Sequence, residues 1–214
     1  ISDGTNRGSA LSYTVTVTDA TEIIILDGQT GSVAEDASVG DAVMTVSITD
    51  STPTAILFTA GNADGIFAIA TSGAVTIADT TNLVFETMAS YTLTIVAYDA
   101  SSSDVADITI SITNANDAPT LATAQADETA TEDTAYSVDV SGNFADVDVG
   151  DTLTYTATGM PSTMTMSTAG VLSGTPLNAD VGTSTVVVTA TDGTASITDT
   201  FDIVIANTND APTY

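Results

Sequence analysis

The sequence predicts an all-β fold made of two tandem Greek-key β-sandwiches. The first reason is length, because 214 residues are too many for one such sandwich and suit two of about 100 residues each. The second is a strand-like alternation of apolar and polar residues. The third is an internal repeat, in which both halves of the chain carry the same landmarks in the same order.

Apolar and polar residues alternate along several short segments. The alternation runs through 91–97 and 108–112 in the first half, and through 186–190 and 201–205 in the second. Segments of this length and period, broken by Gly, Asp, Asn and Ser, are typical of antiparallel strands with one buried face. The abundant Thr and Val also favour strands, and we find no segment with a helical pattern.

The repeat is marked most clearly by a polar linker motif. Asn114-Ala115-Asn116-Asp117-Ala118-Pro119-Thr120 recurs 93 positions later as Asn207-Thr208-Asn209-Asp210-Ala211-Pro212-Thr213. Similarly, Ala34-Glu35-Asp36 recurs as Thr131-Glu132-Asp133. These landmarks define one unit at 20–117 and a second at 118–211, with 212–214 beginning the next linker. Residues 1–19 do not fit inside a full unit, so we expect them to be the last strand of a preceding repeat, with an edge that needs a partner.

The charge balance excludes several classes of function. The chain has 28 acidic residues, one basic residue (Arg7), no His and no Cys, and its formal net charge is −27. Nucleic acid is excluded as a partner because phosphate binding requires Lys and Arg, and no apolar segment is long enough for membrane insertion. Without His, Cys or Lys, a glycosidase-like pair of carboxylates is the remaining enzymatic alternative. We expect no enzyme.

The motifs between these landmarks resemble bacterial cadherin-like tandem repeats. In 20–117 the motifs that are similar to a cadherin domain are Val33-Ala34-Glu35-Asp36, Gly65-Ile66-Phe67-Ala68-Ile69 and Leu83-Val84-Phe85-Glu86. In 118–211 the motifs Phe144-Ala145-Asp146-Val147-Asp148-Val149-Gly150-Asp151 and Gly170-Val171-Leu172-Ser173-Gly174-Thr175-Pro176 are similar to the dystroglycan-type cadherin-like variety. The resemblance implies cadherin-like, immunoglobulin-like sandwiches of a large secreted or cell-surface bacterial adhesin.

The resemblance also implies calcium at the junction of the two units. Carried over residue by residue, the ligands are Glu35 and Glu86 on the first unit, Asn114, Asn116 and Asp117 in the linker, and Asp146, Asp148 and Asp192 on the second unit. Such an oxygen-rich set suits Ca²⁺, which takes about six to eight oxygen ligands. Val84 and Asn114 stand where the family has Asp, so we expect weaker or fewer ions on the first unit's half of the site.

Other acidic residues carry a weaker signal. Isolated acids such as Asp27, Asp64 and Asp79 are interpreted as ordinary turn residues. Two poorer clusters lie at the outer ends of the units: Asp19, Asp50 and Asp99 upstream, and Glu132, Asn209 and Asp210 downstream.

These observations predict a calcium-stiffened stalk, or extender, for cell adhesion and biofilm formation, with neighbouring repeats of the same chain as its partners. The alternative is a calcium-dependent binding module for polysaccharide or for another adhesin domain, including homophilic association. Sugar sites usually stack an aromatic ring, but the chain has no Trp, and Tyr91 and Phe201 lie in the apolar phase of their strands. Tyr13, Tyr136 and Tyr155 remain as platforms, with core or edge packing as the competing interpretation.

Overall fold

The computed structural model describes residues 22–209, which form two compact units. The first comprises 22–33, 37–83 and 90–112, and the second comprises 34–36, 84–89 and 113–209. The predicted strand of a preceding repeat, 1–19, lies outside the described residues. Among the residues described, no helix is long and apolar enough to cross a membrane.

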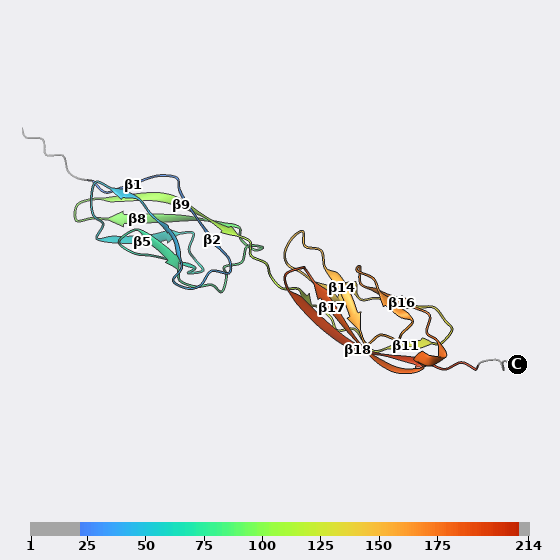
Figure 1. Cartoon of the computed structure of the whole chain (residues 1–214). Coiled ribbons are helices and arrows are strands. Elements are labelled where there is room, and N and C mark those ends of the chain that lie inside the picture. Colours follow the sequence, from blue (N-terminus) through green and yellow to red (C-terminus); the bar gives the residue numbers. More distant parts are fainter. Residues whose placement is uncertain (1–21, 210–214) are drawn as a thin grey trace, which may run out of the picture. The chain divides into compact units, whose positions relative to one another are not determined.

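The first unit is built from three sheets (Figure 1). A four-stranded sheet has the order β2-β9-β8-β5, a three-stranded sheet has the order β3-β7-β6, and β1 pairs with β4. The strands are β1 (Ile24–Ile25), β2 (Gln29–Ala34), β3 (Ala42–Thr45), β4 (Ile48–Thr49), β5 (Ala55–Ala60), β6 (Phe67–Ile69), β7 (Ala74–Ile77), β8 (Ser90–Tyr98) and β9 (Ser103–Thr113).

The second unit has sheets of the same sizes. Their orders are β11-β18-β17-β14, β12-β16-β15 and β10-β13. The strands are β10 (Thr120–Leu121), β11 (Glu128–Thr131), β12 (Tyr136–Asp139), β13 (Phe144–Ala145), β14 (Thr154–Thr158), β15 (Met164–Met166), β16 (Val171–Gly174), β17 (Gly182–Thr191) and β18 (Ser196–Ala206). Two short 3-10 helices, Ser141–Asn143 and Asn178–Asp180, are the helical turns of this unit that the structure describes.

Each strand of the second unit corresponds to the strand of the first unit whose number is lower by nine, so that β11 corresponds to β2 and β18 to β9. In the larger sheet β11 pairs in parallel with β18, whereas β17 pairs antiparallel with both β18 and β14. The predicted all-β class and the two tandem sandwiches are therefore confirmed, and the repeat seen in the sequence is a repeat of the whole strand order.

The predicted alternation is the burial pattern of the long strands. Leu93 and Ile95 of β8 and Ile108 and Ile110 of β9 are fully buried, and the second core contains Val186, Val188, Phe201, Ile203 and Ile205. Burying a side chain of this size contributes about 1.5–3 kcal/mol, so these paired strands supply much of the stability of each unit.

Three tyrosines pack in or against the cores of the two units. Tyr91 is buried as predicted, and its ring meets Phe67 edge to face with ring centroids 5.3 Å apart. Tyr155 is 6% exposed and packs against Phe144 with centroids 5.7 Å apart. The hydroxyl of Tyr136 is buried. Tyr91 and Tyr155 therefore present no open ring face for a sugar, Tyr136 is half-buried against the second core, and Tyr13 lies outside the described residues.

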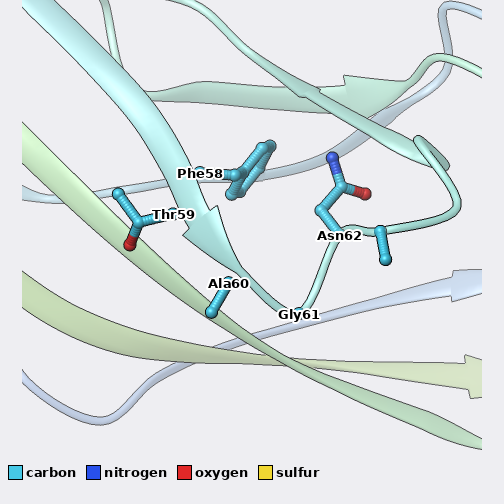
Figure 2. A pocket seen from close by; sticks show the side chains of 6 residues that line it. Phe58, Thr59, Ala60, Gly61 and Asn62 are labelled. Atoms are coloured by element: carbon cyan, nitrogen blue, oxygen red, sulfur yellow. The ribbon is translucent and has the colours of Figure 1, made fainter.

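A glycine follows the edge strand of the larger sheet in each unit. Gly61 has a φ of 82° and a side chain there would meet the carbonyl oxygen of Thr92; Gly159 has a φ of 73° and stands in the same relation to Thr185. Figure 2 shows the chain turning at Gly61 beyond Ala60, at a hollow of the first unit. Residues 58–63 line this hollow without a titratable side chain, so it offers no acid–base or metal chemistry.

Candidate metal centre

Three carboxylates from separate parts of the sequence meet in the second compact unit. Glu35 directly follows β2, Glu86 lies in the turn 84–89, and Asp117 lies in the linker after β9. One carboxylate oxygen from each lies within 4.8 Å of the others. Three of the eight residues predicted as ligands are thus brought together.

Glu35 orders the segments around this group. One of its carboxylate oxygens accepts a hydrogen bond of 2.8 Å from the backbone N–H of Ala115, and the other accepts one of 2.7 Å from the backbone N–H of Phe85. Its own backbone N–H donates to the carbonyl oxygen of Thr113 at 3.2 Å. A single side chain therefore ties the turn 84–89 and the linker to the segment after β2.

A second group of three carboxylates lies on the loop that follows β13. Oxygens of Asp146, Asp148 and Asp151 lie within 4.8 Å of one another. Asp146 Oδ1 accepts a 3.0 Å hydrogen bond from the backbone N–H of Asp148. Asp146 Oδ2 is buried and has no hydrogen-bond partner in the described part of the chain. An orphaned buried carboxylate oxygen is costly unless something positive meets it.

Asp151 is the acid of this group that the sequence analysis did not select. The sequence did contain a sign of its role, because three of the six residues 146–151 are acidic. The turn at Gly150, whose φ is 110°, brings Asp151 back so that its backbone N–H donates to the Asp148 carbonyl oxygen at 3.2 Å.

Asp148 connects the linker to this loop. The side chain is 6% exposed. Its Oδ1 accepts a 2.8 Å hydrogen bond from the side-chain amide of Asn114, and its Oδ2 accepts one of 2.8 Å from the backbone N–H of Asp117. Asn114 therefore lies beside the carboxylates, as expected, but it contacts them as a hydrogen-bond donor.

Asn116 and Asp192 form a separate contact. The Asn116 amide donates to Asp192 Oδ2 at 3.1 Å and to the carbonyl oxygen of Asp117 at 2.9 Å. Backbone N–H groups of Ala195 and Thr194 hold the pKa of the Asp192 carboxyl below its ordinary value. Asp192 belongs to neither group of three carboxylates; the structure places it beside the linker, joined through Asn116.

The closeness of these acids changes their electrostatics. Burial, followed by the negative charges of Glu35, Asp148 and Asp146, raises the pKa of the Asp117 carboxyl. At Glu86 a hydrogen bond with its own backbone lowers the pKa, but desolvation and the charges of Glu35, Asp148 and Asp117 raise it overall. Residues 22–209 contain no Lys, Arg or His, so no described side chain can neutralise the groups.

The donor set fits a hard divalent cation. Ca²⁺ binds carboxylate and carbonyl oxygens at about 2.3–2.6 Å, so two ligands on opposite sides of one ion are about 4.8 Å apart. The spacing of both carboxylate groups is compatible with that limit. There is no thiolate or imidazole to select zinc or copper, and the orphaned oxygen of Asp146 offers an unused acceptor.

The upstream cluster of Asp19, Asp50 and Asp99 differs from this arrangement. Asp99 is a turn residue whose oxygens accept hydrogen bonds from the Ser51 hydroxyl and from the backbone N–H groups of Ser101 and Ser102, and these hold its pKa well below the ordinary range. Asp50, with a φ of 67°, is a turn residue too, and Asp19 lies outside the described residues.

At the other end, Glu132 repeats the arrangement of Glu35. It is 1% exposed, and it accepts a 2.6 Å hydrogen bond from the backbone N–H of Thr208. Its Oε2 has no hydrogen-bond partner within residues 22–209.

Solved structures with the same fold are extracellular domains of cadherins. Mouse cadherin-23 EC22-24 matches with a TM-score of 0.65 at 22% sequence identity, over 87% of this chain and 65% of that one. Protocadherin gamma B2 domains 3-6 match with a TM-score of 0.68 at 21% identity, over 88% of this chain and 48% of that one. The fold is cadherin-like. Human mucin-like protocadherin EC1-2 has this cadherin-like fold as well, with a TM-score of 0.61 at 16% identity, over 88% of this chain and 100% of that one.

Sequence comparison supports an immunoglobulin-like fold for the second unit. A family model described as a putative Ig domain matches residues 118–206. No curated protein matches the chain. The chain spans 65% and 48% of the first two cadherin structures named above.

Proposed function

We propose that this chain is a calcium-stiffened extender module of a large secreted or cell-surface bacterial adhesin, and that it works without catalysis. The observation that carries the proposal is the pair of carboxylate groups, Glu35 with Glu86 and Asp117, and Asp146 with Asp148 and Asp151. They lie in a part of the chain with no cationic side chain. The cadherin-like fold supports the same conclusion.

The chain connectivity explains how binding would stiffen the module. Glu35 directly follows β2, and the linker that carries Asp117 directly follows β9; both strands belong to the larger sheet of the first unit. Asp146 and Asp148 follow β13 of the second unit. Calcium supplies positive charge that these acids can share, and its binding free energy favours the conformation that presents all of them together.

Apart from its hydrogen bonds to Glu35, Asp148 and Asp192, the linker has little apolar packing of its own. Asn114 to Thr120 includes no bulky apolar side chain, and small polar contacts between domains usually permit hinging. We therefore infer that the spacing of successive repeats depends on calcium, and that the repeats act as a spacer for a binding region elsewhere in the adhesin.

Calorimetry and scattering test this function. Isothermal titration of the metal-free chain with calcium chloride should show saturable binding, and Asp146→Asn should weaken it at least tenfold, whereas Asp27→Asn, in an exposed turn, should not. Chelation should lower the melting temperature and shorten the maximum dimension measured by small-angle scattering. Sodium chloride at equal ionic strength should restore neither, because screening acts on all surface carboxylates alike. Equal restoration by salt would refute the proposal.

A further inference from the structure

We infer that the first unit carries a docking surface on the outer face of its larger sheet. Its occupant is a partner polypeptide whose contact surface has an apolar centre and a rim of Lys or Arg side chains. The docking surface consists of an apolar strip, Leu57, Val96 and Val105, and of a hollow beside it that two carboxylates border. It contains none of the acids of the candidate metal centre, so this inference does not depend on the proposed calcium function.

The apolar strip runs across three neighbouring strands, β5, β8 and β9 (Figure 1). Leu57 pairs with Val96, and Val96 pairs with Val105. Their neighbours along the strands are buried core residues, namely Ile56, Ile95, Ala97 and Ala106. Because alternate side chains of a strand point to opposite faces of the sheet, the strip lies on the outer face. Cross-strand neighbours on one face are about 4.5–5.5 Å apart, so the three side chains form one continuous apolar surface.

This strip is open to solvent at both ends. Leu57 and Val105 are 54% and 57% exposed, whereas Val96 between them is buried. Tyr98, at the next outward position of β8, is exposed too and extends the apolar area. Single exposed apolar side chains are ordinary on a protein surface, but a contiguous exposed patch marks an interaction site.

The second unit shows that the fold does not require an apolar strip at this place. The corresponding row there consists of three threonines, Thr156, Thr189 and Thr198. The two rows correspond because each contains the third residue pair counted from the turn between the two long strands. Threonine suits a strand as valine does, and the two units share one strand order. The exposed apolar side chains of the first unit are therefore not needed to form the sheet, and a partner can bury them.

A hollow of about 620 Å³ borders the strip at Val105. Asp27, Thr94 and Asp107 also line it, and both aspartates are exposed. Asp107 Oδ1 accepts a 2.7 Å hydrogen bond from the hydroxyl of Thr94, which holds this carboxylate beside the strip. In the second unit the position of Asp107 is occupied by Thr200. The first unit thus differs from the second both in its apolar strip and in the negative charge next to it.

These two features together select a partner that is both apolar and basic. Lys and Arg side chains lay their aliphatic stems along apolar surfaces and keep the charged head at the edge. The strip accepts such stems and other apolar side chains, and Asp27 and Asp107 accept the charged heads. Residues 22–209 contain no Lys, Arg or His, so no described side chain competes for these carboxylates. A second copy would instead bring like charges together, which is unfavourable.

Isothermal titration calorimetry with a synthetic probe peptide tests the docking surface. The probe is Lys-Thr-Val-Thr-Val-Thr-Val-Thr-Lys, which in an extended conformation presents its valines and both lysines on one face. Measured in EGTA, so that the calcium site plays no part, the unmodified chain should bind the probe saturably. Exchange of Val for Ser, or of Lys for Glu, in the peptide should weaken binding by about tenfold or more. No saturable binding of the probe overturns the inference.

Variants of the chain assign the binding to the strip and the hollow. The double variant L57T/V105T gives the first unit the residues of the second without a change of charge, and should weaken probe binding by about tenfold or more. Thermal melting followed by circular dichroism checks that this variant is folded. Asp107→Asn keeps an acceptor for Thr94, and should weaken binding by about threefold or more and reduce its salt dependence. Asp133→Asn removes one exposed charge from the second unit and should leave the affinity unchanged.

Equal affinity of L57T/V105T and the unmodified chain overturns the role of the strip. Equal losses for Asp107→Asn and Asp133→Asn overturn the role of the hollow. Neither result bears on the proposed extender function, which the calcium titration tests separately.

Two other occupants of this face would give different results. Sedimentation velocity should show a monomer, and association that L57T/V105T abolishes would assign the face to a second copy. Arg7→Gln should leave probe binding unchanged, because the proposed occupant comes from another molecule. Tighter binding by Arg7→Gln would assign the face to residues 1–21, which carry the one basic side chain of the chain. Either of these assignments overturns the proposed partner.

Discussion

The carboxylate of Asp199 accepts a 2.6 Å hydrogen bond from the backbone N–H of Gln125, a residue 74 positions earlier. Asp199 is 7% exposed, and its other oxygen accepts from the backbone N–H of Thr200 at 2.9 Å. In the first unit Asp104 binds the backbone N–H of Ile25 in the same way at 2.7 Å. Each unit thus uses an acid at the start of its last long strand to hold the segment that enters the unit.

We therefore expect Asp199→Ala to destabilise the second unit by about 1–3 kcal/mol, because the half-buried N–H of Gln125 loses its acceptor. Urea unfolding followed by circular dichroism measures the loss, and calcium should not restore it because this acid lies outside both carboxylate groups. Asp133→Asn, at an exposed acid of the same unit whose positive φ of 58° asparagine tolerates, removes one charge and provides the comparison. Equal losses for the two variants would show that the Asp199 contact is not specific.

Alanine at Gly61 or Gly159 should destabilise its unit by more than about 1 kcal/mol. Positive φ alone costs an L-residue about 1 kcal/mol or more, and at these positions the new Cβ would also meet a backbone carbonyl oxygen. Gly65 separates the cost of the positive φ from the cost of the steric overlap, since its φ is 71° but nothing lies near the added Cβ. The Gly61→Ala variant should unfold at a lower urea concentration than the Gly65→Ala variant. The reverse order would show that overlap of the new Cβ with the carbonyl oxygen adds no cost.

The stability that Asp180 contributes should disappear in acid. The backbone N–H of Leu177 and the hydroxyls of Thr163 and Ser162 lower the pKa of this carboxyl from 3.8 to about 2. A lowered pKa stabilises the fold above about pH 4, and this contribution is lost as the pH falls towards 2. Asp180→Asn should melt a few degrees lower at pH 7, and the gap to the unmodified chain should close between about pH 4 and 2. A gap that is constant with pH would rule out this charge effect.

Val84→Asp should tighten calcium binding by about tenfold or more, equivalent to about 1.4 kcal/mol. Val84 lies in the same turn as Glu86, and its carbonyl oxygen accepts hydrogen bonds from Thr87 and Met88 at 3.2 and 3.0 Å. The added charge would join Glu35, Glu86 and Asp117, so the variant should also melt lower in EGTA. Val84→Asn keeps the size without the charge, and calorimetry that gave equal tightening for both would contradict the prediction.

Much of the fold could be predicted from the sequence because period-two alternation directly reports which face of a strand is buried. Leu93, Ile95, Val186 and Val188 were identified in this way and lie in the cores. The repeat motif likewise predicted two similar units, and the structure shows that they share one strand order. The four strands of two residues each, β1, β4, β10 and β13, could not be predicted in this way, because two residues are too few to show an alternation.

The candidate site was less accessible for a physical reason. The resemblance to cadherin-like repeats selected Asp146 and Asp148 as candidate ligands, but the role of a carboxylate depends on which N–H groups face it. The carboxylate of Asp148 accepts hydrogen bonds from two donors, whereas one oxygen of Asp146 has no partner among the described residues. This difference cannot be read from the positions of the two residues in the sequence. Asp151 was not selected although three acids lie within six residues of the sequence; the positive φ at Gly150 is what brings it close to Asp148.

The parallel pairing of β11 with β18 has a mechanical consequence. Glu128–Thr131 run beside 203–206 in register and in the same direction, so the entering end of β11 and the leaving end of β18 lie at opposite ends of the pair. Tension applied through the two ends of the unit therefore loads the hydrogen bonds between these strands in shear, all at once, and does not peel them one by one. In a pulling experiment the second unit should resist until this patch ruptures as a whole, and then extend in a single step.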